Sequence, residues 1–339
     1  MAEWNENKLE QELENLMEDI PVQEDLEKEI AQSITRRIKR TAGITVIAIL
    51  LAAAVLFLCI SPLMNMMFWD PTDPGEGEQL LAFSVLRDYW ETTTPYVDLV
   101  SMQVEKQGFG CYQLAIQVTN QREILHIGGA NLWIEVNRGK YENRQDAAGY
   151  FTHQMHRFGE DSDAFMNFFN EQDKAEMLQD LQELPQSAYV YLSVAGEKPR
   201  GIQNLRDELG DMLLLWVQVY QPNVDFQGGL NMRVTAAYEQ EDLREVLSEK
   251  ELLEVYRSNL KNLLDNRKIW EQFGLCDGKY IYGCKSGALE KTYEDAQTLE
   301  MLTVKNYCIS GTRDDIIAYL QQTEVTFLRV DQVRLSQWN

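Results

Sequence analysis

Residues 36–70 read RRIKRTAGITVIAILLAAAVLFLCISPLMNMMFWD, and the uncharged core of this stretch runs from Ala42 to Ile60. At about 1.5 Å of rise per residue, a helix of these nineteen residues covers roughly the 30 Å hydrocarbon thickness of a bilayer. Hydrocarbon offers the backbone no hydrogen-bond partners, so a lone apolar segment is stable there only as a helix. The sequence therefore predicts one transmembrane helix within residues 41–69.

The charges on the two sides of the predicted span have opposite signs. By the positive-inside rule, basic residues before the span and acidic residues after it predict a cytoplasmic N-terminus and an extracytoplasmic remainder, in a single-pass protein of the cell membrane. Phe68 and Trp69 suit the outer interface, where aromatic rings are favoured. The flanking charges are Arg36, Arg37, Lys39 and Arg40 before the span, and Asp70, Asp73, Glu76 and Glu78 after it.

Two other interpretations of this stretch fit the sequence less well. A cleaved signal peptide has a short basic start and an apolar region of about 7–15 residues, whereas about forty patterned, acidic residues precede this longer apolar run. A buried globular helix would not gather all four basic residues at one end. Ala48 and Ala52 have the spacing of a helix-dimer face, which arises easily by chance in an alanine-rich segment.

Charge and cysteine content narrow the classes of function. The chain has 339 residues and a net charge of −23; residues 1–69 hold 6 basic and 11 acidic residues (−5), which leaves −18 outside. Neither part has the basic footprint of a nucleic-acid-binding protein. The five cysteines are too few for a disulfide scaffold. Cys276 and Cys284 flank a hairpin-like stretch and either form a disulfide or stay free thiols.

The N-terminal residues 1–40 form an acidic, apolar-striped tail. Apolar residues recur at helical spacing before Pro21, and a second stripe restarts at Val22 and includes Leu26, Ile30 and Ile34. A helix of this length is marginal alone in water, so the stripe needs a partner. Three interpretations remain: a docking element for a cytosolic protein, a coiled coil with itself or a sister chain, and a helix lying on the inner leaflet.

The outer part alternates between helical and strand-like segments. Two segments, 189–220 and 301–330, both read strand, glycine-containing turn, short helix, strand, which predicts an α+β domain containing two β-α-β-like units. We expect subdomains at 70–185 and 186–339. The other expected elements are helices over 80–91, 145–157, 164–183 and 202–209, strands over 111–119, 130–136, 188–194 and 213–220, and a long helix over 243–273 with a break near Ser258.

Catalytic and metal-binding motifs are not recognisable in the sequence. His153 and His156 are three residues apart in a predicted helix, whereas helical zinc pairs more often use a spacing of four, and His126 stands alone. The acidic composition supplies carboxylate pairs without any particular arrangement. We therefore expect a protein that is not an enzyme and holds no metal or cofactor.

Several stretches together resemble a known family. RRIKRTAGITVIAILLAAAVLFL, followed by GFGCYQL at Gly108–Leu114, resembles the N-terminal part of the membrane-bound sigma factor regulators of Gram-positive bacteria. AYVYLSVAGEKPRGIQNLRDEL with LLLWVQVY, and CISGTRDDIIAYLQ with VTFLRVDQV, look like their C-terminal domain. The resemblance implies an anti-sigma factor, whose tail holds an extracytoplasmic-function sigma factor at the membrane until an envelope signal is sensed outside.

On this model the tail stripe forms the contact surface for the sigma factor, and the outer domain receives an envelope ligand or a second membrane protein. Residues 1–41 contain neither histidine nor cysteine, so the HxxxCxxC zinc site of one known anti-sigma pattern is absent. The alternative is a membrane-tethered outer binding or assembly module whose tail only oligomerises. The predicted contact residues are Trp4, Leu9, Leu13, Leu16, Met17, Ile20, Leu26, Ile30 and Ile34.

Overall fold

The computed structural model describes residues 22–74, 80–95, 97–120, 130–145, 171–232, 247–272 and 287–335. The chain divides into two compact units, Met1–Met64 and Asn65–Asn339. The predicted mixture of helices and sheets, with one long apolar helix near the N-terminus, is confirmed.

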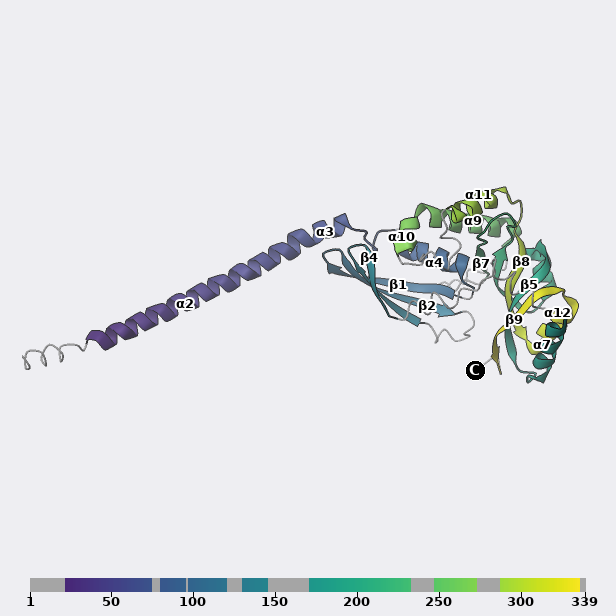
Figure 1. Cartoon of the computed structure of the whole chain (residues 1–339), viewed down its shortest axis with the longest axis horizontal. Coiled ribbons are helices and arrows are strands. Elements are labelled where there is room, and N and C mark those ends of the chain that lie inside the picture. The colour runs from purple at the N-terminus through teal and green to yellow at the C-terminus, as the bar shows by residue number, and fades with distance from the viewer. Residues whose placement is uncertain are drawn as a thin grey trace, which may run out of the picture. The chain divides into compact units, whose positions relative to one another are not determined.

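The N-terminal helical region consists of three consecutive segments (Figure 1): α2 (Val22–Val55), the π-helical turn η1 (Leu56–Ile60) and α3 (Ser61–Met67). At the end of η1 the Ser61 N–H donates to the carbonyl of Leu56, five residues back. Pro62 follows immediately and has no N–H to donate, which explains why the regular i to i−4 ladder is interrupted here.

Within the described residues, one helical stretch, Glu27–Met67, is long and apolar enough to cross a membrane. Its most apolar window is not buried by the chain; Leu58, for example, is 72% exposed. This exposure contradicts the alternative of a buried globular helix, because such a helix packs its apolar side chains inside the protein.

The first sheet is an antiparallel meander in the order β1-β2-β3-β4. The predicted strands over 111–119 and 130–136 are confirmed as β2 and β3. The strands on either side of them, β1 and β4, were not expected, and Gln145 lies in β4 rather than in the predicted helix over 145–157, whose remaining residues are outside the described part. The strands are β1 (Val97–Gly108), β2 (Cys111–Asn120), β3 (Ala130–Asn137) and β4 (Lys140–Gln145).

The second sheet has the order β7-β6-β8-β5-β9, with antiparallel neighbours throughout. Helix α8 (Ile202–Leu209) lies between β5 and β6 in the chain, and α12 (Arg313–Gln322) lies between β8 and β9. Because β5 and β6 are both antiparallel to β8, they run parallel to each other with β8 between them. The strands are β5 (Tyr189–Gly201), β6 (Leu213–Val219), β7 (Gly229–Asn231), β8 (Thr303–Thr312) and β9 (Val325–Arg334).

Both faces of β5 are buried. Val190, Leu192 and Val194 belong to the main core cluster, which also contains the apolar residues of α8 and α12, whereas Tyr189 and Tyr191 belong to a second cluster with residues of β6 and β8. Alternating side chains of a strand point to opposite faces, so the sheet is covered on both sides. This explains the near-continuous apolar run AYVYLSV.

Of the described helices between β6 and β8, the first two pack beside α4 (Leu81–Thr93), which itself packs on β1, and the last packs on the first (Figure 1). They are α9 (Glu249–Asp265), α10 (Arg267–Gln272) and α11 (Ala288–Thr298), the last of which was not expected. The predicted break near Ser258 is wrong. Ser258 lies inside α9, and the helix ends at Asp265; the next residue, Asn266, caps it and its side-chain amide donates to the Asn262 carbonyl at 3.0 Å. A capping box at Ser248 and Glu251 begins α9.

One hydrophobic cluster includes residues from both sheets, such as Leu114 of β2 and Leu192 of β5. Trp216 of β6 donates its indole N–H to the Glu91 carbonyl of α4 at 2.9 Å. Helix α7 (Glu171–Glu183), the described part of the helix predicted over 164–183, packs on α12. The boundary that we predicted between residues 185 and 186 stays a prediction.

Candidate functional site

The structure describes only part of the predicted tail surface. Ile30 and Ile34 lie four residues apart on α2 and are 50% and 51% exposed. Leu26 lies on the same helix. The other predicted contact residues lie outside the described residues: Trp4, Leu9, Leu13, Leu16, Met17 and Ile20.

The predicted membrane flanks differ in their surroundings. Arg36, Arg37, Lys39 and Arg40 are all exposed on α2. Trp69, by contrast, is partly buried and packs against the main core of the outer unit. The placement of Phe68 and Trp69 at a membrane interface therefore stays a prediction, and these rings also have a packing role in the folded unit.

The last residues of α3 belong to the same compact unit as the two sheets, and they contact the first sheet in a cluster that we call the membrane-proximal junction: Asn65, Phe68, Asp70, Lys106 and Gly110. The Gly110 N–H donates to the side-chain oxygen of Asn65 at 2.7 Å. Gly110 has φ +74°, and a Cβ placed there would lie 2.8 Å from the Phe68 ring. Only glycine adopts this backbone conformation easily and leaves room for the ring.

Asp70 completes the membrane-proximal junction. Its carboxylate accepts hydrogen bonds from the Thr72 N–H at 2.8 Å and hydroxyl at 2.6 Å, and Lys106 Nζ lies 3.0 Å away. Burial by itself would raise the pKa of Asp70, but the Thr72 hydrogen bonds and Lys106 outweigh it and the pKa lies below its ordinary value. Burial, and then the charge of Asp70, raises the pKa of Tyr112 to about 12.

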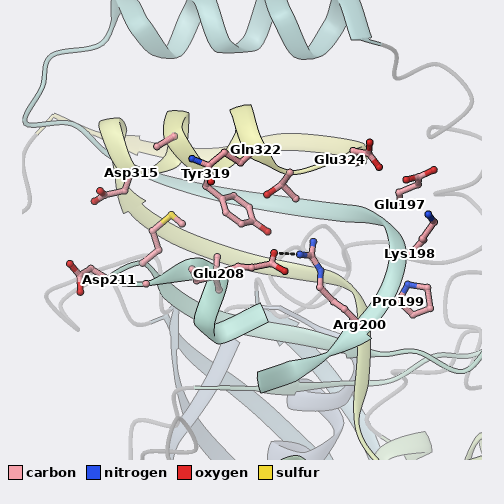
Figure 2. A pocket seen from close by; sticks show the side chains of 15 residues that line it. Glu197, Lys198, Pro199, Arg200, Glu208, Asp211, Asp315, Tyr319, Gln322 and Glu324 are labelled. Atoms are coloured by element: carbon pink, nitrogen blue, oxygen red, sulfur yellow. Dashed lines mark hydrogen bonds and ion pairs between the residues drawn. The ribbon is translucent and has the colours of Figure 1, made fainter. Parts of the chain in front are cut away.

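A pocket of about 710 Å³ lies in the second sheet region, beside the C-terminal ends of α8 and α12 (Figure 2). We call it the acidic pocket. The end of β5 supplies Glu197–Arg200, the end of α8 and the following turn supply Glu208–Met212, and α12 with the residues after it supplies Asp315, Ala318, Tyr319 and Gln322–Glu324. Gly210 adopts φ +57° in the turn, as expected of a glycine that ends a helix.

Arg200 lies inside this pocket and makes three contacts with two residues, Glu208 and Tyr307. Its guanidinium pairs with the Glu208 carboxylate (dashed in Figure 2) and donates to the Tyr307 hydroxyl at 2.9 Å. It also stacks 5.4 Å from the centre of the Tyr307 ring. The hydroxyls of Tyr307 and Tyr319 are hydrogen-bonded to each other at 2.6 Å. Burial raises the pKa of both phenols, so they stay neutral hydrogen-bonding groups.

The lining of the acidic pocket has an excess of negative charge. Five carboxylates face two cations, a formal net charge of −3, and the two helix C-termini add partial negative charge. Glu324 has a raised pKa because the side chain of Glu197 hydrogen bonds to it and repels its charge. Chemically, the arrangement suits a positively charged group. The charged residues are Glu197, Glu208, Asp211, Asp315 and Glu324, against Lys198 and Arg200.

Metal and disulfide predictions concern residues outside the described part of the chain, namely His126, His153, His156, Cys276 and Cys284. Among the described residues, no group of three or more histidine, cysteine or acidic side chains is arranged to hold a metal ion. Cys59, Cys111 and Cys308 are free thiols.

Comparison of the chain with protein-family models, with curated proteins and with solved structures gave no match. The family resemblance therefore stays a sequence-based expectation.

Neither the junction nor the acidic pocket was anticipated from the sequence. Each is assembled from segments far apart in the chain: 45 residues separate Asn65 from Gly110. The available signals were the glycine pair around Phe109, typical of a tight turn, and the acidic residues that surround Arg200 in EKPRG and RDELGD. These signals indicate turns and charge, but they do not show which segments meet.

Proposed function

We propose that the protein is a single-pass, N-in membrane protein that acts as an anti-sigma factor. Its tail holds an extracytoplasmic-function sigma factor, and its outer domain responds to an envelope signal. The observation that carries the proposal is the half-exposed pair Ile30 and Ile34, which lies on α2 just before the basic residues that precede the apolar span. An apolar stripe at the end of an acidic segment has the properties needed to bind a basic partner, because opposite charge steers encounter and the stripe supplies burial.

We further propose that the second sheet consists of two interleaved β-α-β units. The strand order β6-β8-β5-β9 supports this, because each helix joins two parallel strands that are separated by one strand of the other unit. This is the split β-α-β arrangement, which leaves both helices free to pack on one face. The acidic pocket, at the C-terminal ends of these two helices, is the part of the outer domain best suited to receive a cationic signal ligand.

The test uses the full-length chain in membranes of its native cell. We expect a sigma factor to co-purify with the chain and to be lost when Ile30 and Ile34 are both replaced by Glu. The matched control is Gln32→Glu with Thr35→Glu, which adds the same charge on the opposite side of α2. Transcription from the sigma-dependent promoter should rise with the first variant only.

The alternative, an outer assembly module with an oligomerising tail, predicts a different result. In that case the Ile30→Glu/Ile34→Glu variant changes the size of the detergent-solubilised oligomer and no sigma factor is recovered with the native chain. That outcome would reject the anti-sigma proposal.

A further inference from the structure

We propose that the turns at one end of the first sheet contact anionic lipid headgroups and so seat the outer domain on the membrane surface. The surface consists of Phe109 in the β1–β2 turn and Arg138 and Lys140 in and beside the β3–β4 turn, and we call it the headgroup surface. The proposal depends on the membrane span of the proposed function and does not depend on capture of a sigma factor.

The two turns lie next to each other and next to the end of the apolar helix. The Arg138 N–H donates to the Gly110 carbonyl at 2.8 Å, and the Gly110 N–H donates to Asn65 at 2.7 Å. Arg138 is therefore linked to Asn65 of α3 through a single residue. The turns that join β1 to β2 and β3 to β4 are fixed at this end of the sheet by the β2–β3 pairing of Cys111 with Asn137.

The depth of Asn65 follows from the predicted span. Asn65 lies five residues beyond Ile60, and α3 covers Ser61–Met67, so the rise to Asn65 is about 7.5 Å. The headgroup layer occupies about 5–7 Å on each side of a hydrocarbon core of about 30 Å. Asn65 is therefore placed at the outer edge of the headgroup layer, and the hydrogen bond from the Gly110 N–H keeps the two turns beside it.

The charge of the headgroup surface is opposite to that of the rest of the outer domain. Arg138 and Lys140 are both exposed, and within the residues that the structure describes neither has an ion-pair partner. Of the nearby acids, Asp70 is paired with Lys106, and Asp73 interacts electrostatically with the same pair. In a part of the chain with net charge −18, two exposed cations beside the membrane end of the helix are the groups best placed to meet lipid phosphates. Each basic residue near an anionic membrane is expected to strengthen the contact roughly fivefold.

The experiment uses the full-length chain in lipid nanodiscs, with a photo-crosslinking amino acid in place of Gln107, an exposed residue of β1 beside the turn. One set of nanodiscs contains phosphatidylcholine alone and the other contains phosphatidylcholine with about one third phosphatidylglycerol. We expect at least fivefold more protein–lipid crosslinks in the anionic nanodiscs, and a decrease as salt is raised, since exposed charges are screened over about a Debye length.

The variant Arg138→Glu/Lys140→Glu should lose the preference for anionic lipid. The control Lys250→Glu/Lys291→Glu makes the same change of charge at exposed positions of α9 and α11, and it should keep the preference for anionic lipid. The neutral variant Arg138→Gln/Lys140→Gln should give an intermediate crosslink yield. Thermal unfolding of each variant verifies that the outer unit is folded.

Several results would overturn the proposal. Equal crosslinking in neutral and anionic nanodiscs, unchanged by the charge reversal, would mean that the helix merely tethers the turns near lipid. If the chain were inserted in the membrane but gave no lipid crosslinks, the two turns would not lie at the membrane surface. If a soluble glycerol phosphate polymer at matched charge abolished the crosslinks, the headgroup surface would be a binding site for a soluble polyanion instead. A chain extracted from the membrane by alkali would instead contradict the span itself, and with it the membrane part of the proposed function.

Discussion

The side-chain carbonyl of Asn65 accepts a hydrogen bond from the backbone N–H of Gly110 at 2.7 Å, across 45 residues of sequence. Asn65 is the last polar residue before the predicted outer boundary at Asp70, and Gly110 is in the turn between β1 and β2. The bond therefore joins the end of the apolar helix to the first sheet.

Asn65→Ala should lower the free energy of unfolding of the outer unit by about 1 kcal/mol, because the Gly110 N–H loses its acceptor. Urea unfolding of the full chain in detergent measures this, and hydrogen exchange of the Gly110 amide should become faster. Asn204→Ala, at an exposed position of α8, is the matched control and should change the free energy by less than about 0.5 kcal/mol. Equal effects of the two substitutions would contradict the role given to Asn65.

A comparison of Gly110→Ala with Gly139→Ala distinguishes the cost of backbone strain from the cost of steric contact. Both glycines have positive φ, +74° and +75°, so both alanines pay about 1 kcal/mol for the left-handed conformation. Only at Gly110 does the new Cβ meet the Phe68 ring, at 2.8 Å, whereas Gly139 has open space. We expect Gly110→Ala to be more destabilising by about a further 1–2 kcal/mol, and Phe68→Leu to recover part of that difference. Equal melting temperatures of the two single variants would show that the Phe68 ring moves aside without a measurable cost in stability.

Trp216→Phe tests whether the two sheets unfold together. The substitution removes the indole N–H that reaches the Glu91 carbonyl at 2.9 Å and should cost about 1–2 kcal/mol. Because the core is shared, tryptophan fluorescence and far-UV circular dichroism should report one transition at a lower urea concentration. Trp133→Phe, at a 48% exposed position of β3, is the control that should leave the midpoint nearly unchanged. Two separate transitions in the wild-type chain would disprove the common core.

Glu197→Gln should remove the repulsion that raises the pKa of Glu324. A group with a raised folded-state pKa stabilises the fold below its ordinary pKa of 4.5, and this contribution is lost as the pH rises through the folded-state value. Removing the Glu197 charge removes this repulsion, so the variant should have a higher melting temperature at pH 7 and an unchanged one at pH 4. Carboxyl-resolved NMR should find the pKa of Glu324 shifted toward 4.5. Glu183→Gln, an exposed carboxylate of α7, is the control, and a pH-independent effect of Glu197→Gln would refute the pairing.

The elements that were predicted correctly have strong local signals. Helix α8 was predicted with its observed ends because Ile202, Leu205 and Leu209 recur at helical spacing and Gly210 follows them. Strand β1 was missed because its second half, QVEKQG, is polar and exposed in the sheet, so it lacks an apolar alternation. The break of the long helix was misplaced because Ser258 and Asn266 are both weak helix formers, and only the fold shows which side chain bonds to the helix end.

The sequence by itself determined the properties that depend on neighbours along the chain. These are the apolar span from Ala42 to Ile60, the basic residues before it, the acidic tail and the strand–helix–strand order within segments 189–220 and 301–330. Hydropathy, charge and periodicity act over a few consecutive residues, so they can be read without a fold.

The tertiary structure alone decided which distant segments meet. It placed Gly110 on Asn65 and brought Arg200, Tyr307 and Tyr319 together in the acidic pocket. Such contacts depend on strand register and sheet order, which are set by the burial of the whole core rather than by any local pattern. For that reason the candidate sites among the two sheets emerged only from the fold, whereas the helix that is long and apolar enough to span a membrane was already evident in the sequence.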